Sequence, residues 1–241
     1  MRLKSTRFVR WLVKPLPKRW QRVTRRVFLC SLLALLLPVP VILVIAVVQP
    51  PMTAVMMEQT IGRVFSGARP VWPRHTTVSR AKLSPNLRRA VLASEDDRFY
   101  LHHGIDFVEL DKAFERRRRG GKLRGASTLT QQVAKNLFLW NGRSFLRKGL
   151  EVYLTLWLEL LLSKERLLDV YLNLAEWGPS TYGAEAAARL HYGKSATSLS
   201  RDEAARLAAI LPSPKRWRPN GAIATRRAAT ILERMNVPSL K

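Results

Sequence analysis

The residues with the clearest chemical potential lie in one short stretch, Ser94–Asp106. Its thirteen residues include six side chains that carry a carboxyl or imidazole group: Glu95, Asp96, Asp97, His102, His103 and Asp106. Groups of this kind exchange protons in solution, so the stretch could supply a general base or a general acid. A solvated helix end has the same composition, and both interpretations remain open at this point.

The preceding residues predict a helix that positions this stretch. Three apolar residues recur there at helical spacing, namely Leu87, Val91 and Leu92. We therefore expect a helix over residues 85–93 that presents Glu95 and Asp96 at its end and packs Phe99 on the same apolar face. Gly104 is expected to break this helix. A carboxylate at such a helix–loop edge is suitably placed to act as the base of a cleft.

A second polar face follows in residues 127–138. Ser127, Gln131 and Lys135 are spaced four residues apart, so a hydroxyl, an amide and an ammonium group share one side of a helix. The opposite side is apolar and is expected to be buried. Ser127 or Thr128 can cap the helix, and the amides of a helix N-terminus suit a phosphate group. A merely solvated face is the alternative.

A basic group with a carboxylate comes next. Arg143, Arg147 and Glu151 repeat the spacing of four, and Lys148 lies beside them. One interpretation is an ordinary surface ladder of ion pairs, which contributes little to stability. The other is a clamp for a diphosphate that is accompanied by a second functional carboxylate.

The charge of the chain favours an anionic partner. The 241 residues include 42 Lys and Arg against 17 Asp and Glu, which gives a formal net charge of +25. Residues 1–26 hold ten of the basic residues and no acid, yet the remainder still carries a charge of +15. Nucleic acid, a phosphorylated lipid or a membrane surface could attract such a protein.

An apolar run favours the membrane among these partners. The 22 residues Val27–Val48 carry no charge, and we expect them to cross a bilayer as a helix kinked by Pro38 and Pro40. A cleavable signal is the competing interpretation, but the run is too long and lacks a small-residue cleavage site. The single cysteine, Cys30, cannot form an intrachain disulfide.

The basic residues before this run predict its orientation. They should keep the N-terminus in the cytoplasm and place the rest of the chain on the other side of the membrane. In a bacterium that side is the periplasm, where nucleic acid is absent, so nucleic-acid binding is excluded. We divide the chain into a basic tail (1–26), a transmembrane helix (27–48), a juxtamembrane segment (49–75) and a mainly α-helical domain (76–241).

The rest of the domain is expected to be helical, without sustained strand alternation. Glu159, inside an apolar stretch, is expected to be a paired structural carboxylate. The expected elements are a basic loop (116–125), a central core helix (152–162), a helix that stops at Gly178, a helix opened by the capping box Ser200–Glu203, and a last basic helix (225–235).

These stretches together resemble the peptidoglycan glycosyltransferase family, which includes monofunctional biosynthetic transglycosylases and the N-terminal module of bifunctional penicillin-binding proteins. The first family motif, Glu-Asp-x-x-Phe-x-x-His-x-Gly-x-Asp, is matched by Glu95, Asp96, Phe99, His102, Gly104 and Asp106. The second, Gly-Gly-Ser-Thr-x-x-Gln-Gln-x-x-Lys-Asn, is matched over residues 125–136, which include Ser127, Gln131, Gln132, Lys135 and Asn136.

Two further motifs follow in the same order. Arg147-Lys148 with Glu151 matches the third, and Lys164 to Asn173 matches the fourth. The similarity runs from about residue 91 to residue 219, with small departures at Ala126, which replaces a glycine, and at Asp169, which replaces a glutamate.

The resemblance implies a reaction, which is the polymerisation of lipid II into β-1,4-linked glycan with inversion at the anomeric carbon. Glu95 would take the proton from the attacking 4-hydroxyl, with Asp96 and Asp97 supporting its basicity. Lys135 and Arg143, with Arg147 as a helper, would stabilise the leaving diphosphate. Glu151 would be the second functional carboxylate, organising those cations or a divalent metal.

The resemblance also implies the setting of that reaction. The fold would be a lysozyme-like helical large lobe with a smaller lobe near the membrane, anchored in the bacterial inner membrane. The partners would be lipid II, the growing glycan strand and membrane lipid, and cell-division or elongation proteins are further candidates. No cofactor is obligatory, although the resemblance leaves room for Mg²⁺ or Mn²⁺ at the diphosphate near Glu151.

Three rival interpretations are weaker. A lytic transglycosylase or lysozyme-like hydrolase also relies on a glutamate, but its leaving group is a neutral sugar and needs no cationic clamp. A non-catalytic scaffold has no reason to keep Glu95 and Glu151. A transpeptidase is disfavoured because Ser79-Arg-Ala-Lys82 lacks the companion motifs of that class.

Overall fold

The computed structural model describes residues 17–121 and 127–237, and the chain divides into two compact units between Pro40 and Val41. Residues 1–16 of the predicted basic tail and residues 122–126 at the end of the predicted basic loop, including Gly125 and Ala126, therefore lie outside the described residues.

The first unit contains the long helix α2 (Lys18–Leu36), in which no residue is buried. A turn at Leu37–Pro38 separates it from α3 (Val39–Val47). This break is the interruption predicted from Pro38 and Pro40, because proline lacks a backbone donor and disfavours a helical residue before it. The stretch Lys18–Val47 contains a window of mean hydropathy 2.8 and is long and apolar enough to cross a membrane.

The end of the apolar run belongs to the second unit. Ile42 and Ile45 are only 0% and 5% exposed. The guanidinium of Arg166 donates hydrogen bonds of 2.7 and 2.8 Å to the carbonyl oxygens of Ile45 and Val48. The last turns of the predicted membrane helix are thus packed against protein.

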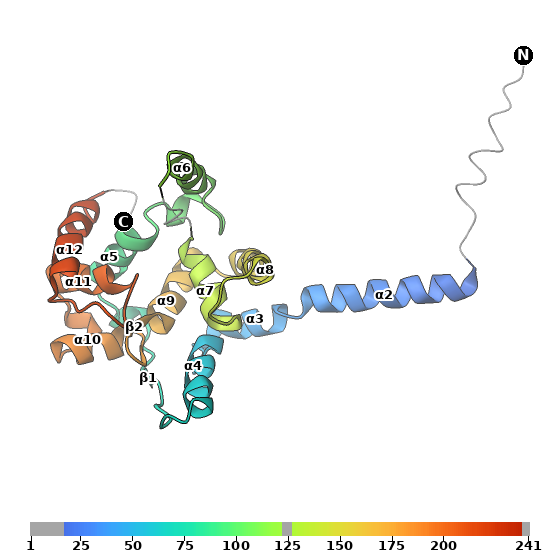
Figure 1. Cartoon of the computed structure of the whole chain (residues 1–241), viewed down its shortest axis with the longest axis horizontal. Helices are drawn as coiled ribbons and strands as arrows, with labels where there is room; N and C mark the ends of the chain where they lie inside the picture. Colours follow the sequence, from blue (N-terminus) through green and yellow to red (C-terminus); the bar gives the residue numbers. More distant parts are fainter. Residues whose placement is uncertain (1–16, 122–126, 238–241) are drawn as a thin grey trace, which may run out of the picture. The chain divides into compact units, whose positions relative to one another are not determined.

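The second unit is mainly helical, in agreement with the expected fold class (Figure 1). Its remaining helices are α4 (Ala54–Phe65), α5 (Pro85–Glu95), α6 (Phe107–Arg118), α7 (Leu129–Phe138), α8 (Phe145–Leu161), α9 (Lys164–Leu174), α10 (Ala184–Tyr192), α11 (Arg201–Ile210) and α12 (Ala222–Arg234). Short 3₁₀ turns occur at Arg80–Lys82, Phe99–Leu101 and Ala196–Ser198. This composition is consistent with a lysozyme-like helical domain.

A small sheet was not foreseen. Strand β3 (Thr181–Tyr182) lies between β1 (Arg74–His75), to which it is parallel, and β2 (Glu176–Gly178), to which it is antiparallel. The helix predicted to reach Gly178 ends at Leu174, and β2 follows it. Strands of two or three residues are too short to show alternation in the sequence.

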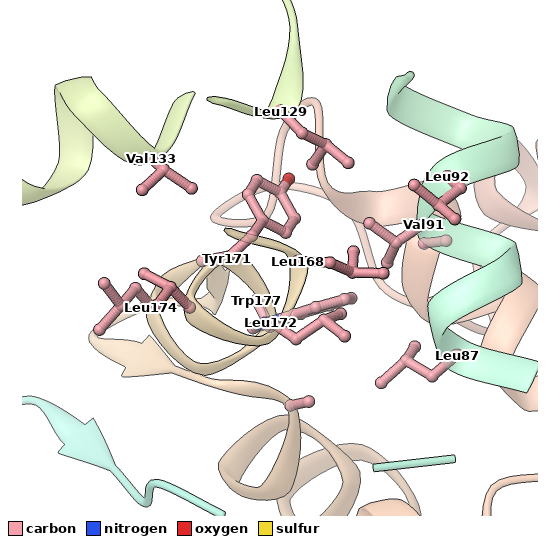
Figure 2. Packing of buried hydrophobic residues seen from close by; sticks show 14 of the residues in the cluster. Leu87, Val91, Leu92, Leu129, Val133, Leu168, Tyr171, Leu172, Leu174 and Trp177 are labelled. Atoms are coloured by element: carbon pink, nitrogen blue, oxygen red, sulfur yellow. The ribbon is translucent and has the colours of Figure 1, made fainter. Parts of the chain in front are cut away.

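Helix α9 forms the centre of the core. Every residue from Leu167 to Leu174 is buried. Figure 2 shows Tyr171 and Leu168 of α9 between the side chains of α5 and α7. Each fully buried aliphatic or aromatic side chain of this kind contributes roughly 1.5–3 kcal/mol.

The prediction of a central core helix over residues 152–162 was wrong. Helix α8 buries only Glu151, Leu154, Thr155 and Leu158, whereas Leu156 and Leu160 are 54% and 72% exposed. Its apolar composition therefore reflects a narrow buried stripe with an exposed apolar surface beside it. Continuous apolar composition does not distinguish these two faces.

Helix α5 carries the acidic stretch as expected. Ser84 caps its N-terminus, Pro85 occupies the first turn, and Leu87, Val91 and Leu92 are buried. Gly104, however, does not end this helix, which already stops at Glu95 with Asp96 as its C-cap. Gly104 has a φ of +83°, and a Cβ there would lie 2.7 Å from Cγ2 of Thr155. The glycine instead allows the loop to approach α8.

Two other local predictions are confirmed. Ser200 and Glu203 form the reciprocal capping box that opens α11, and α12 covers the expected last helix. Glu159 is paired as expected, because it accepts a hydrogen bond from Thr130 Oγ1 and lies 2.8 Å from the ammonium of Lys164.

Candidate active site

Glu95 lies at the end of α5, and two neutral donors hold its carboxylate. Ser94 Oγ donates to Oε1 at 3.0 Å, and Gln132 Nε2 donates to Oε2 at 3.2 Å. Burial raises the pKa of Glu95, and the hydrogen bonds from Gln132 and Ser94 oppose that shift. A carboxylate with a raised pKa is a stronger base, so this environment suits proton abstraction.

Further residues orient these donors. Tyr171 Oη donates to Gln132 Oε1 at 3.1 Å, which directs the amide nitrogen of Gln132 toward Glu95. On the other side, the guanidinium of Arg227 lies 3.5 Å from Ser94 Oγ, and its charge lowers the pKa of Glu95. The sequence analysis did not assign Ser94, Tyr171 or Arg227, because they are spread over three helices and have no common spacing.

Asp96 serves the local fold. Its Oδ1 lies 3.0 Å from His102 Nε2, and its Oδ2 accepts a hydrogen bond of 2.9 Å from the backbone amide of Leu129. Asp96 is thus the C-cap of α5 and also binds the start of α7. Among the causes of the raised pKa of Glu95, the charge of Asp96 comes after burial. Asp97 is exposed, and its expected support of Glu95 stays a prediction.

Asp106 likewise has a structural role. It caps α6 by accepting hydrogen bonds from the amides of Val108 and Glu109, and it pairs with Arg98 at 3.0 Å. Asp96, His102 and Asp106 place potential metal ligands within 4.8 Å of one another. Since the carboxylate oxygens of this group are already bound to amides and side chains, we assign the group to holding the loop.

The N-terminus of α7 is already occupied by protein groups. Thr128 is the N-cap, and Gln131 completes a capping box by accepting from the amide of Thr128 at 3.1 Å. Asp96 takes the amide of Leu129. The expected phosphate site at this helix end therefore contains a carboxylate of the protein itself.

This arrangement removes Gln131 from the diphosphate site and leaves the assignment of Ser127 as a prediction. Gln131 is buried and takes part in capping, and Ser127 is exposed and precedes the helix. Of the predicted face, Lys135 is the residue that reaches a cavity. Gln132, one position after Gln131, is the glutamine that contacts Glu95.

Lys135 lines a cavity of about 210 Å³, as do Gln132 and Asn136 of the same helix. Across from them lie Glu176 and Tyr182 of the small sheet. Burial lowers the pKa of Lys135, while the charge of Glu151 opposes that shift. Because Gln132 both lines the cavity and binds Glu95, it connects the candidate base to the space that could hold a ligand.

The second carboxylate lies at the start of α8. Glu151 is 4% exposed, and its two oxygens pair separately with Arg147 and Lys148. Arg143 precedes the N-cap Ser144 and is exposed, so it does not share the helical face predicted from its spacing. The charges of Glu151 and Arg147 both act on the pKa of Lys135, although neither residue lines the cavity.

The remaining motif residues support the loop. Phe99 is 1% exposed, packs edge-on against His102 and lies under the ammonium of Lys164. Gly104 accepts a hydrogen bond of 2.6 Å from Thr128 Oγ1 at its carbonyl, which ties the loop to α7.

Comparison with known proteins agrees with this geometry. A family model described as Transglycosylase matches residues 60–236. A biosynthetic peptidoglycan transglycosylase of Pseudomonas aeruginosa is 48% identical over 214 residues, covering 88% of this chain and 91% of the relative. Proteins of the same name from Pseudomonas entomophila and Pseudomonas fluorescens are 50% identical over 191 residues and 45% identical over 227 residues. These matches cover 78% and 93% of this chain, and 80% and 91% of the relatives.

Proposed function

The chain belongs to the transglycosylase family, and we propose that it polymerises lipid II into β-1,4-linked glycan strands for the bacterial cell wall. The product released from the donor is undecaprenyl diphosphate. The observation that carries this proposal is the connection of a partly buried base to a cavity lined by a lysine, because Gln132 binds Glu95 and lines the same cavity as Lys135.

Glu95 acts as the general base. It takes the proton of the acceptor sugar's 4-hydroxyl as that oxygen forms a bond to the anomeric carbon of the donor and the bond to the diphosphate breaks. A single displacement converts the α-linked donor into a β-linked product. Ser94 and Gln132 orient the carboxylate, and its burial maintains the basicity that the step requires.

Lys135 and Arg147 stabilise the diphosphate, on which negative charge increases as the bond breaks. Glu151 holds Arg147 and Lys148 by ion pairs and so fixes the positions of these two cations. Arg143, exposed before α8, contributes from the solvent side. Tyr182 lines the cavity with a buried hydroxyl that has no partner among the described residues, which suits a sugar hydroxyl.

A divalent cation would find its ligands mainly on the diphosphate. The carboxylate of Glu151, where a metal was expected, already pairs with two side-chain cations. We therefore propose that Mg²⁺ or Mn²⁺, if bound, adds charge neutralisation to that of the lysine and arginine side chains without a dedicated carboxylate site.

The apolar stretch Lys18–Val47 supports membrane attachment. We propose a single-pass protein of the inner membrane with a cytoplasmic N-terminus and a periplasmic catalytic unit, because basic residues precede the span. The substrate is itself held in the bilayer by its lipid, so an anchored enzyme meets it in the same plane. Proteins of cell division or elongation remain candidate partners.

The test is polymerisation of fluorescent lipid II by the detergent-solubilised protein and its Glu95→Gln variant. We expect a glycan ladder with the wild type, digested by muramidase, and at least a hundredfold slower synthesis by the variant, which keeps the shape but not the basicity of Glu95. Glu233→Gln, an exposed change on α12, is the matched control. Residual activity of Glu95→Gln within tenfold of wild type would remove Glu95 as the base.

A hydrolase is the second outcome that the same experiment can reveal. Cleavage of preformed peptidoglycan without any ladder would assign the chain to the lytic class. The partly buried Lys135 disfavours that result, since a neutral leaving sugar carries no charge for a cation to stabilise.

A further inference from the structure

A second cavity, of about 270 Å³, lies beside the first. One wall is the polar side of α4, with Gln59, Arg63 and Ser66, and the other wall includes Ser180 and Lys215. Of the described residues that line this cavity, two are cationic and none is acidic. The family motifs of the sequence analysis include none of its residues.

Glu176 lies between the two cavities, because it lines the first and contacts two residues that line the second. Glu176 lines the first cavity, and its Oε2 accepts a hydrogen bond of 3.2 Å from Gln59 Nε2. Its Oε1 lies 3.5 Å from the ammonium of Lys215. A ligand in the first cavity is therefore separated by the Glu176 side chain from Gln59 and Lys215, which line the second cavity.

The wall made by Ser180 is held in place. Ser180 has a φ of +51° in the turn between β2 and β3, and its carbonyl accepts a hydrogen bond of 2.8 Å from the amide of Arg74. A non-glycine residue in this conformation is maintained only where the surrounding structure determines it, and such sites often adjoin ligands. The strained turn places a serine at the cavity where a glycine would be easier to accommodate.

We propose that this second cavity is an anion subsite, which binds the carboxylates of the peptide carried by the substrate's sugar. The inference rests on the proposed function and adds a recognition element to it. Lipid II combines a diphosphate, two sugars and an acidic peptide branch. With the diphosphate at Lys135, the branch is the remaining anionic part, and a guanidinium binds carboxylates well. The proposal gives a role to two of the basic residues outside the N-terminal tail.

The first test compares two substrates with two proteins. The substrates are lipid II with free peptide carboxylates and lipid II with those carboxylates amidated. The variant is Arg63→Gln combined with Lys215→Gln. We expect the wild type to prefer the free acid by about tenfold in kcat/KM. The variant should lose this preference while it uses the amidated substrate at the wild-type rate.

Two matched variants test whether charge is the cause. Arg226→Gln with Arg234→Gln removes the same charge from the exposed side of α12 and should keep the wild-type preference. Arg63→Lys with Lys215→Arg keeps both charges at the cavity and should largely restore the preference. An equal loss with the α12 variant would show a general charge effect and overturn the subsite.

A binding measurement separates this proposal from the proposed function. The free acidic pentapeptide is titrated into the full chain in detergent, and we expect weak, salt-sensitive binding that the double variant loses. If the wild type polymerises lipid II but does not distinguish the two substrates, the subsite is wrong and the function stands. If the peptide binds at this cavity but no polymer forms, the function is wrong and the subsite stands.

An anionic lipid headgroup is the other occupant that the same cations could attract. Binding to vesicles with and without phosphatidylglycerol tests it. A loss of vesicle binding by the double variant, with substrate preference unchanged, would assign the cavity to lipid and overturn the peptide proposal.

Discussion

Glu95 receives its two hydrogen bonds from a hydroxyl and an amide, and the nearest cation, Arg227, acts through Ser94. A direct ion pair would lower the pKa of the carboxylate strongly. Neutral donors orient it while lowering its pKa less. The environment thus combines a raised pKa with a fixed geometry, which is the combination that a general base needs.

Ser94→Ala tests this balance. Loss of the donor raises the pKa of Glu95 further, because that hydrogen bond favours the charged form. A base must be deprotonated, so the acid limb of the rate profile should move to higher pH, with slower synthesis near pH 6 and partial recovery near pH 9. Initial rates across this range measure the shift. Arg227→Gln should move the limb in the same direction, and an unchanged limb in both variants would contradict the assignment.

Tyr171→Phe tests the orientation of Gln132. Without the hydroxyl donor, the amide of Gln132 can turn its oxygen toward Glu95, so kcat should fall about tenfold with little change in KM. Stability should fall by about 1 kcal/mol for the lost hydrogen bond. Tyr192→Phe, whose hydroxyl has only a 3.5 Å contact with the Glu203 carbonyl, is the control. Equal effects of both changes on kcat would remove Tyr171 from the site.

Glu151→Ala tests the paired cations at the start of α8. The carboxylate and Arg147 are 5% and 12% exposed as side chains, so the change leaves a poorly solvated guanidinium without its partner. We expect a loss of about 3 kcal/mol in denaturant unfolding, together with loss of turnover. Glu109 and Lys112 form the same kind of ion pair but are more exposed to solvent. Glu109→Ala should therefore lower the free energy of unfolding by less than about 1 kcal/mol.

At the scale of the elements, local signals identified the helices well. The apolar spacing in α5, the capping box of α11 and the basic last helix all appear where the sequence predicts them. These features depend on residues three or four positions apart, so sequence spacing contains the needed information.

Predictions failed where distant segments determine the result. Spacing placed Gln131 on a ligand-binding face, but its side chain is needed for the cap of α7, and Asp96 from another helix takes the adjacent amide. The motif resemblance identified Gln132 and Lys135 as members of the site. The fourth motif includes Tyr171 but does not show its contact with Gln132, and neither motif nor period could show that Arg227 reaches the site. Such contacts depend on tertiary packing, which produces no periodic pattern in the sequence.

Gly104→Ala tests how closely the acidic loop must approach α8. The positive φ and the 2.7 Å approach of a Cβ to Thr155 should together cost more than about 2 kcal/mol and reduce activity. Gly67→Ala has a φ of +71° with open space around it, so it carries the backbone strain alone. Similar unfolding free energies for the two variants would show that the close approach is unimportant.

At the scale of the whole molecule, the division after Pro40 predicts where the chain can be shortened. Removal of residues 2–40 should leave the melting temperature of the catalytic unit nearly unchanged, because α2 buries no residue. Removal through Val48 should lower it by several degrees, since Ile42 and the carbonyl bound by Arg166 are then lost. Equal melting temperatures would show that α3 adds no stability.

The sequence predicted the membrane-compatible run but not this division within it. Hydropathy treats Val27–Val48 as one apolar stretch, although the side chains of Ile42 and Ile45 are buried in contacts with the folded unit. Burial in lipid and burial in protein select the same side chains, so composition cannot assign the last turns to one or the other.

The packing of α3 has a consequence for encounter with substrate. A long flexible linker would let the catalytic unit occupy a large volume above the bilayer. The effective concentration of the active site near the lipid-bound donor would then be low. Because Ile42 and Ile45 are packed in that unit, little chain is left to act as a linker, and under the proposed membrane attachment the unit searches a layer close to the bilayer. Under the proposed function and attachment, each elongation step then depends on the surface density of lipid II, and a finished strand can leave while the enzyme stays at the membrane.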